Sequence, residues 1–229
     1  MASSTAADGD DEVVREFGPI LRVYKSGRLE RPLVAPPVGP GHDAATGVHS
    51  RDVHLGDYSA RLYLPPPAAA AERLPVVVYV HGGGAAAPPP QGPRWLIHPW
   101  FWGSEARRAR RPLDPEGRAR GAGLWVYACP GTTGMDDPRM NPMAPGAQPL
   151  GRMACDRVMV CAAEGDFLRW RAHAYAAAVA AAKGGAAVEV LETAGAGHVF
   201  HLFDPDGDKA KELLDRMVTF VNGAGADAA

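Results

Sequence analysis

Three short segments of this chain carry residue types suited to chemistry at a carbonyl group. His81–Gly84 follows an apolar run, Asp166 follows a second such run, and His198 follows a third. Glycines directly after a buried strand let the backbone turn tightly, so that its N–H groups can stabilise an oxyanion. A carboxylate can orient an imidazole, which then acts as a general base. Together the segments predict acyl transfer.

Each segment also has a purely structural interpretation. The glycines could form an ordinary turn, and Asp166 could be the N-cap of a helix, a position that favours Asp. His198 could be a surface histidine, and His201, three residues on, competes with it for the role of base. These alternatives stay open at the level of the sequence.

A serine nucleophile for acyl transfer is missing. The chain has six serines, and none lies in a Gly-x-Ser-x-Gly turn. They are Ser3, Ser4, Ser26, Ser50, Ser59 and Ser104. Ser104 is a candidate substitute, but it has no sharp turn to expose it, and Cys129 and Cys161 lack the pair of flanking glycines. Without a nucleophile no acyl-enzyme forms.

The elements that must position these residues alternate between strand and helix. Residues 74–80 and 157–163 are mainly apolar runs typical of strands buried in a parallel sheet, and residues 187–191 are expected to form another strand. Residues 167–182 and 209–221 have helical patterns. The last helix is expected to bury one apolar face, made of Ala210, Leu213, Leu214, Met217, Val218 and Val221. This alternation predicts an α/β fold with a parallel sheet.

Other segments are less regular. Alternating apolar residues around Gly56-Asp57 predict a β-hairpin over 48–64. Residues 95–97 fit a short strand, and 104–123 fit a helix or loop. Proline and glycine make 34–47 and 130–149 loops.

We expect a single domain over residues 13–223, with a disordered tail at 1–12 and a second tail at 224–229. Residues 85–93 are a low-complexity run of Ala, Pro, Gln and Gly that fits neither helix nor strand. The run marks the place of an internal deletion near 85–94, which the family resemblance described below implies.

Composition narrows the classes of function. Of the 229 residues, 46% are hydrophobic and 22% charged, and the net charge of −2 predicts no nucleic-acid or membrane partner. The three cysteines have no metal-binding spacing, so we expect no metal and no cofactor. The N-terminus has no secretory pattern. These features predict a cytoplasmic protein, with the nucleus as the alternative because of four arginines, Arg107, Arg108, Arg110 and Arg111.

Seven stretches of the sequence carry a resemblance to a known protein family. They are REFGPILRVYKSGRLERP, ATGVHSRDVHL, PVVVYVHGGG, HPWFWGSE, CPGTTGMDDPRMNPMAPGA, RVMVCAAEGDFLRWR and GAGHVFHLFDPDGDKAKELLDR. With them the chain resembles the plant carboxylesterases of the α/β-hydrolase fold, the hormone-sensitive-lipase-like group. The order of oxyanion loop, Asp and His is also that of α/β-hydrolases.

The resemblance implies hydrolysis of carboxylic esters of small molecules. It implies that Gly82, Gly83 and Gly84 form the oxyanion loop, that Asp166 is the triad acid and that His198 is the base. It also implies a mostly parallel sheet with flanking helices. Only residues 85–97 separate HGGG from HPWFWG, whereas one βαβ unit takes about 30 residues. We therefore expect an incomplete sheet without its central strands, no nucleophile, and little or no esterase activity.

Two alternatives to a hydrolase remain. The chain could be a non-catalytic protein that binds a small ester or hydrophobic acid, as gibberellin receptors of this family bind a ligand. Those receptors keep the serine turn and lose the histidine, which is the opposite pattern. The chain could also be a truncated product without function. The oligomeric state is open.

Overall fold

The computed structural model describes residues 12–33, 36, 38–56, 59–66, 76–79, 93–104, 123–129, 131–184 and 187–223. The chain divides into two compact units, Met1–Val76 and Val77–Ala229. The glycines Gly82, Gly83 and Gly84, the junction at 85–92 and the tails at 1–11 and 224–229 lie outside the described residues. The single domain expected over 13–223 stays a prediction.

The first unit begins with a small antiparallel sheet, which the sequence patterns did not indicate. Strands β1 (Val13–Phe17), β2 (Leu21–Tyr24) and β3 (Leu29–Glu30) pair in that order. Gly18 and Gly27 adopt positive φ angles of 56° and 83° in the turns between them, a conformation that glycine adopts without steric cost.

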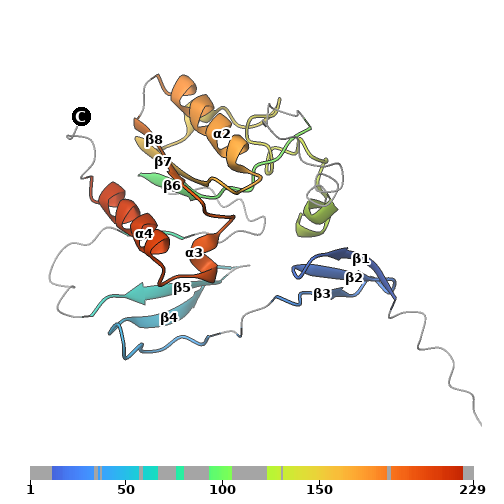
Figure 1. The fold of residues 1–229 in the computed structure, drawn as a ribbon, viewed down its shortest axis with the longest axis horizontal. Coiled ribbons are helices and arrows are strands. Elements are labelled where there is room, and N and C mark those ends of the chain that lie inside the picture. The colour runs from blue at the N-terminus through green and yellow to red at the C-terminus, as the bar shows by residue number, and fades with distance from the viewer. Residues whose placement is uncertain are drawn as a thin grey trace, which may run out of the picture. The chain divides into compact units, whose positions relative to one another are not determined.

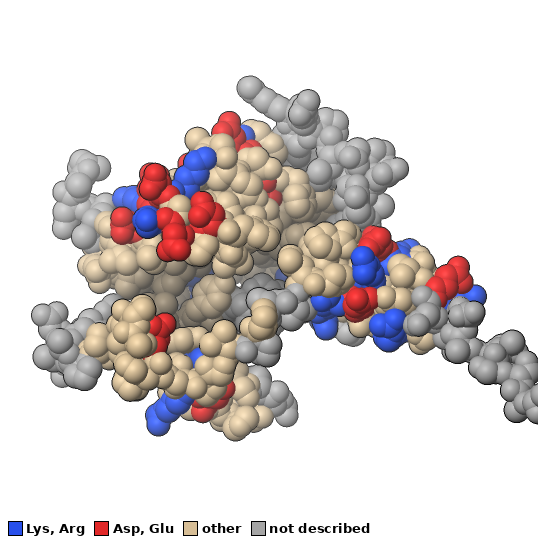
Figure 2. Space-filling view, turned by 60° about the horizontal axis from the view of Figure 1, so that its bottom comes forward, with Lys and Arg blue, Asp and Glu red and all other residues tan. Residues whose placement is uncertain are grey.

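Charged side chains pair across the exposed part of this sheet. Arg22 contacts Glu16 at 2.7 Å, and Lys25 contacts Glu12 at 3.2 Å. Figure 2 shows basic and acidic side chains interleaved there rather than gathered into a patch of one sign. The pairing fits the small net charge of the chain.

The predicted hairpin is confirmed. Strands β4 (His49–His54) and β5 (Ser59–Leu64) are antiparallel, with Val53 opposite Ala60. Gly56 lies just after β4 with a φ of 76°, as a tight connection requires.

The second unit is a three-layer α/β structure. Strands β6 (Arg94–Ile97), β7 (Arg157–Ala163) and β8 (Ala187–Thr193) form a parallel sheet in that order. Helices α2 (Arg169–Ala182) and α4 (Asp208–Val221) cover its two faces (Figure 1). The predicted α/β class, a parallel sheet with flanking helices, is confirmed, and the sheet has three parallel strands among the described residues.

The central strand β7 explains the layers. Its side chains alternate between the two covered faces, so every position from Val158 to Ala163 is apolar, and only Arg157 at its start is charged. Val158 and Val160 pack against α2, whereas Met159 and Cys161 pack against α4. Burial raises the pKa of the Cys161 thiol to about 12, which keeps it protonated and unreactive.

Two expectations about burial are wrong. Leu214 and Val218 of α4 are 57% and 50% exposed, because the helix packs on the sheet through Leu213 and Phe220 instead. Val76–Tyr79, part of the strand expected over 74–80, lies in no strand and is exposed. A strand buried on both faces needs neighbouring strands, and within the described parts of the chain none pairs with these residues.

The remaining elements are short. Residues 123–128 form a helical turn, and Leu150–Arg152 form a 3₁₀ turn, η1. Between them, residues 131–149 are turns and bends, as predicted. Helix α3 (Phe200–Phe203) follows the loop after β8.

Candidate active site

The candidate site lies at the carboxyl ends of the three parallel strands. His98 follows β6 directly, Asp166 lies three residues beyond β7, and His198 lies in the loop after β8. Parallel strands end at the same edge of a sheet, which is where ligand sites of α/β folds are found. Residues up to 100 positions apart in the sequence thus meet at one edge.

The structure brings Asp166 and His198 together. Nδ1 of His198 lies 2.7 Å from Oδ2 of Asp166, and Asp166 is 6% exposed. Since an ionised carboxylate only accepts hydrogen bonds, Nδ1 carries the proton. Nε2 of His198 is then left with a lone pair, as a general base requires.

Hydrogen bonds between the two loops hold this pair. Gly165 N–H donates to the carbonyl of Ala196 at 2.8 Å, and Gly195 N–H donates to the carboxylate of Glu164 at 2.8 Å. A Cβ added to Gly165 would lie 3.0 Å from the Ala196 carbonyl oxygen. The glycine therefore permits the close approach of the two loops.

The N-cap interpretation of Asp166 is wrong. The N-cap of α2 is Leu168, two residues further on. Asp166 does stabilise the turn that leads into the helix, because its Oδ1 accepts the Leu168 N–H at 2.8 Å. One carboxylate thus bonds both the turn and the imidazole.

The loop that carries His198 has an unusual backbone. Val199 adopts φ 47° and ψ 34°, a left-handed conformation that costs a β-branched residue roughly 1–2 kcal/mol. Its N–H donates to Nδ1 of His98 at 3.0 Å. His98 is 4% exposed, and burial lowers its pKa to about 4, so the ring is neutral at pH 7.

His201 does not take the place of His198 beside Asp166. Its ring contacts that of His98 at a centroid distance of 5.7 Å, and burial, with the nearby His198, lowers its pKa. His98 itself was missed as a site residue. The signal that could have found it was its position at the end of the strand expected over 95–97.

Aromatic rings surround the imidazole of His198. The Trp100 ring lies edge-on at 5.8 Å and the Phe167 ring at 6.2 Å, measured between centroids. The two rings also contact each other at 5.5 Å. Phe167 is partly exposed, so this aromatic wall, made of Trp100 and Phe167, offers an apolar surface beside a hydrogen-bonding ring.

The other sequence candidates are not in the site. The hydroxyl of Ser104 donates a short hydrogen bond to Asp136, not to His198. Cys129 and Cys161 are buried. In the described part of the chain no cluster of His, Cys, Asp or Glu could hold a metal ion.

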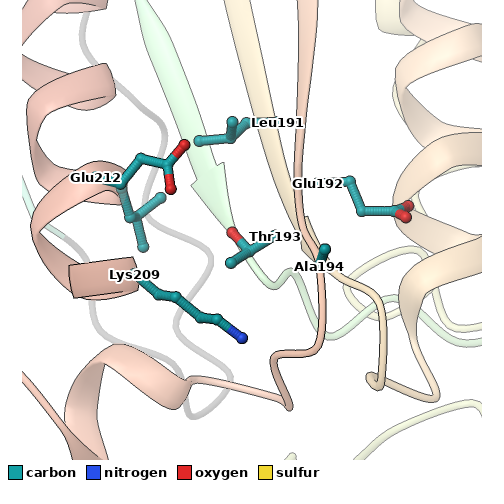
Figure 3. Close-up of a pocket in the computed structure, with 7 residues that line it drawn as sticks. Leu191, Glu192, Thr193, Ala194, Lys209 and Glu212 are labelled. Atoms are coloured by element: carbon teal, nitrogen blue, oxygen red, sulfur yellow. The ribbon is translucent and has the colours of Figure 1, made fainter. Parts of the chain in front are cut away.

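A separate pocket of about 300 Å³ lies beside the carboxyl end of β8. Figure 3 shows Lys209 and Glu212 on one side of β8 and Glu192 pointing to the other. The orientation of Glu192 follows from its bonds to Arg169 and His173 of α2, at 2.7 and 2.6 Å. Asp166 and His198 do not line this pocket.

Replacing Asp166 by asparagine tests the geometry of the pair. The amide oxygen can still accept the Leu168 N–H, but no carboxylate faces His198. We expect the His198 proton to move to Nε2, as read by ¹⁵N NMR of the ring, and the protein to lose about 1–3 kcal/mol of stability. Asp136→Asn is the control, since Asp136 bonds Ser104 and Asn141. An unchanged tautomer in Asp166→Asn would contradict this geometry.

Comparison with known proteins identifies the family. Residues 89–202 match the α/β-hydrolase fold family. Probable carboxylesterase 2 of Arabidopsis thaliana is 38% identical over 128 residues, which are 56% of this chain and 40% of the relative. Tuliposide A-converting enzyme b3, amyloplastic, of Tulipa gesneriana is 39% identical over 128 residues, 56% of this chain and 33% of the relative. The matched region is thus well under half of each relative.

The comparison contradicts the predicted localisation. Tulip relatives are named amyloplastic or chloroplastic, which points to plastids rather than to the cytoplasm or nucleus. Net charge and cysteine count do not encode a plastid address, so composition gave the wrong compartment. No helix in the described ranges is long and apolar enough to cross a bilayer.

The family match covers β6, β7, α2 and β8 together with Asp166 and His198, and the matching relatives include Arabidopsis carboxylesterases. The chain therefore belongs to the α/β-hydrolase fold family, as a relative of the plant carboxylesterases.

Proposed function

We propose that this chain keeps the acid–base pair of a carboxylesterase site but hydrolyses carboxylic esters with little or no rate enhancement. The observation that carries the proposal is the 2.7 Å hydrogen bond between Asp166 and His198 in a chain without a Gly-x-Ser-x-Gly serine. Gly82, Gly83 and Gly84 are the oxyanion loop in this proposal.

The missing step is the activation of a nucleophile. In the triad mechanism the base takes a proton from serine, and the acid stabilises the imidazolium. Here Nε2 of His198 can act only on water. Loss of the nucleophile in a serine hydrolase lowers kcat by a factor on the order of 10⁶. Substrate binding and the oxyanion hole alone give only a small residual rate enhancement.

The test is hydrolysis of a short-chain p-nitrophenyl ester by the purified chain. A cooperative thermal transition must first show that the chain is folded. Its absence would favour the alternative that the chain is a truncated product without function. We expect the same slow rate for the unmodified chain and for His198→Ala. Turnover that vanishes in His198→Ala would overturn the proposal, because it would require a nucleophile that works with His198.

A second function is favoured by the aromatic wall. We propose that Trp100 and Phe167 contact the apolar part of a small hydrophobic acid, and that Nε2 of His198 takes up the proton of the acid and then donates a hydrogen bond to its carboxylate. Such a protein binds without turnover. Its partners are small molecules, not nucleic acid or membranes.

Tryptophan fluorescence tests the binding function. Saturable quenching by an aliphatic or aromatic carboxylic acid is expected, weakened in His198→Ala. Trp170→Phe is the matched control, because Trp170 contacts His173 rather than His198. Quenching that rises linearly with ligand concentration would contradict binding.

A further inference from the structure

His98 connects the sheet to the loop of His198. Its own N–H donates to the Cys161 carbonyl at 3.0 Å, which extends the β6–β7 pairing by one residue. Nδ1 of its side chain accepts the N–H of Val199 at 3.0 Å. One residue thus fixes the loop after β8 to the strands.

The Val199 N–H needs this acceptor. Val199 is the N-cap of α3, so its N–H precedes the hydrogen bonds of the helix. A backbone donor in a partly buried loop is almost always paired, and the left-handed conformation of Val199 persists only where its surroundings impose it. His198 is the preceding residue, and its direction depends on that conformation.

We propose that His98 is a positioning residue, which holds the left-handed turn at Val199 and thereby keeps Nδ1 of His198 against Asp166. The proposal deepens the proposed function, on which it rests for the role of the Asp166–His198 pair. It concerns the geometry of the pair and does not depend on turnover.

The ionisation of His98 supports this role. Only a neutral ring can accept at Nδ1, and burial lowers the pKa to about 4. The groups that face the ring are Asp166, which raises its pKa, and His198 and His201, which lower it. The Phe200 ring lies 5.5 Å away. Nε2 makes no hydrogen bond within the described part of the chain.

Two substitutions distinguish the hydrogen-bond acceptor of His98 from the space that its ring fills. Asparagine places an oxygen near the position of Nδ1 and tolerates a positive φ, and His98 has a φ of 45°. Leucine has no acceptor. We expect His98→Leu to speed hydrogen exchange of the Val199 amide about tenfold or more and to weaken the His198 Nδ1 proton signal, with both rescued in His98→Asn.

The Leu202 amide is the internal control. It donates to the Val199 carbonyl at 2.9 Å, so it reports general loosening of α3. Equal protection of Val199 in all three proteins would overturn the proposal, and so would equal loss in both variants. If the Nδ1 proton signal is absent from the unmodified chain, the proposed pair fails, whereas the Val199 amide still decides the role of His98.

The unmodified protein gives a second test in case His98→Leu does not fold. The folded pKa of His98, about 4, lies below the ordinary value of about 6.5. The unfolded chain therefore binds more protons, and this contribution to stability is lost as the pH falls from about 6.5 to 4. We expect Val199 protection to fall relative to Leu202 over this interval and to stay level in His98→Asn. A level profile in the unmodified protein would overturn the proposal.

Discussion

Replacing Gly103 by alanine is expected to destabilise the second unit by about 2–4 kcal/mol. A Cβ at this position would lie 2.7 Å from Nδ2 of Asn141 and closer still to Nη2 of Arg171. Arg171 is buried, and its guanidinium donates to the Trp102 carbonyl and, at 3.0 Å, to Oδ1 of Asn141. Urea denaturation measures the loss.

The cost is large because the guanidinium cannot move without losing its bonds. A buried charge that loses a partner is much more costly than one at the surface. Gly197→Ala is the matched control, since a Cβ there meets nothing within 4 Å and the backbone is not left-handed. We expect it to change the free energy of unfolding by less than about 0.5 kcal/mol. Similar losses in both variants would contradict the steric argument.

This packing also positions the aromatic wall. Arg171 lies in the first turn of α2, five residues after Asp166, and it holds the carbonyl of Trp102. Trp100 lies two residues before Trp102, beside His198. The buried guanidinium of Arg171 therefore holds the segment after β6 against α2, the helix that follows Asp166.

Much of the second unit could be predicted from the sequence. Within β7, residues 158–163 are apolar at every position because the strand is covered on both faces. The sites of Asp166 and His198 followed from their places after strands, because parallel strands bring such loops to one edge. The local sequence pattern was thus sufficient to predict an element whose side chains are fully buried.

The sequence was less informative where long-range contacts decide the outcome. His98 accepts a hydrogen bond from Val199, which is 101 positions away, and no local sequence pattern predicts such a contact. The strands β1 to β3 are short, and β1 is mostly exposed, so they lack an apolar signature. Val76–Tyr79 has the composition of a buried strand, but composition cannot supply the neighbouring strands that would bury it.

Replacing Phe220 by alanine is expected to cost about 3–5 kcal/mol of stability. Phe220 is 1% exposed and belongs to the core formed with Met159, Cys161 and Leu213. The Arg157 guanidinium lies 4.5 Å from its ring centroid, so the change also removes a cation–π contact. The cavity would lie under the last turn of α4, and thermal and urea unfolding would both report it.

Leu214→Ala is the control on the same helix. The helical pattern placed Leu214 on the buried face, but the structure leaves it 57% exposed, so its truncation opens no cavity. We expect a loss below about 1 kcal/mol. A large loss in Leu214→Ala would mean that another surface covers this side of α4 in solution. A small loss in Phe220→Ala would mean that α4 does not hold the sheet as described, because a buried aromatic ring cannot be removed from a packed core without a large cost.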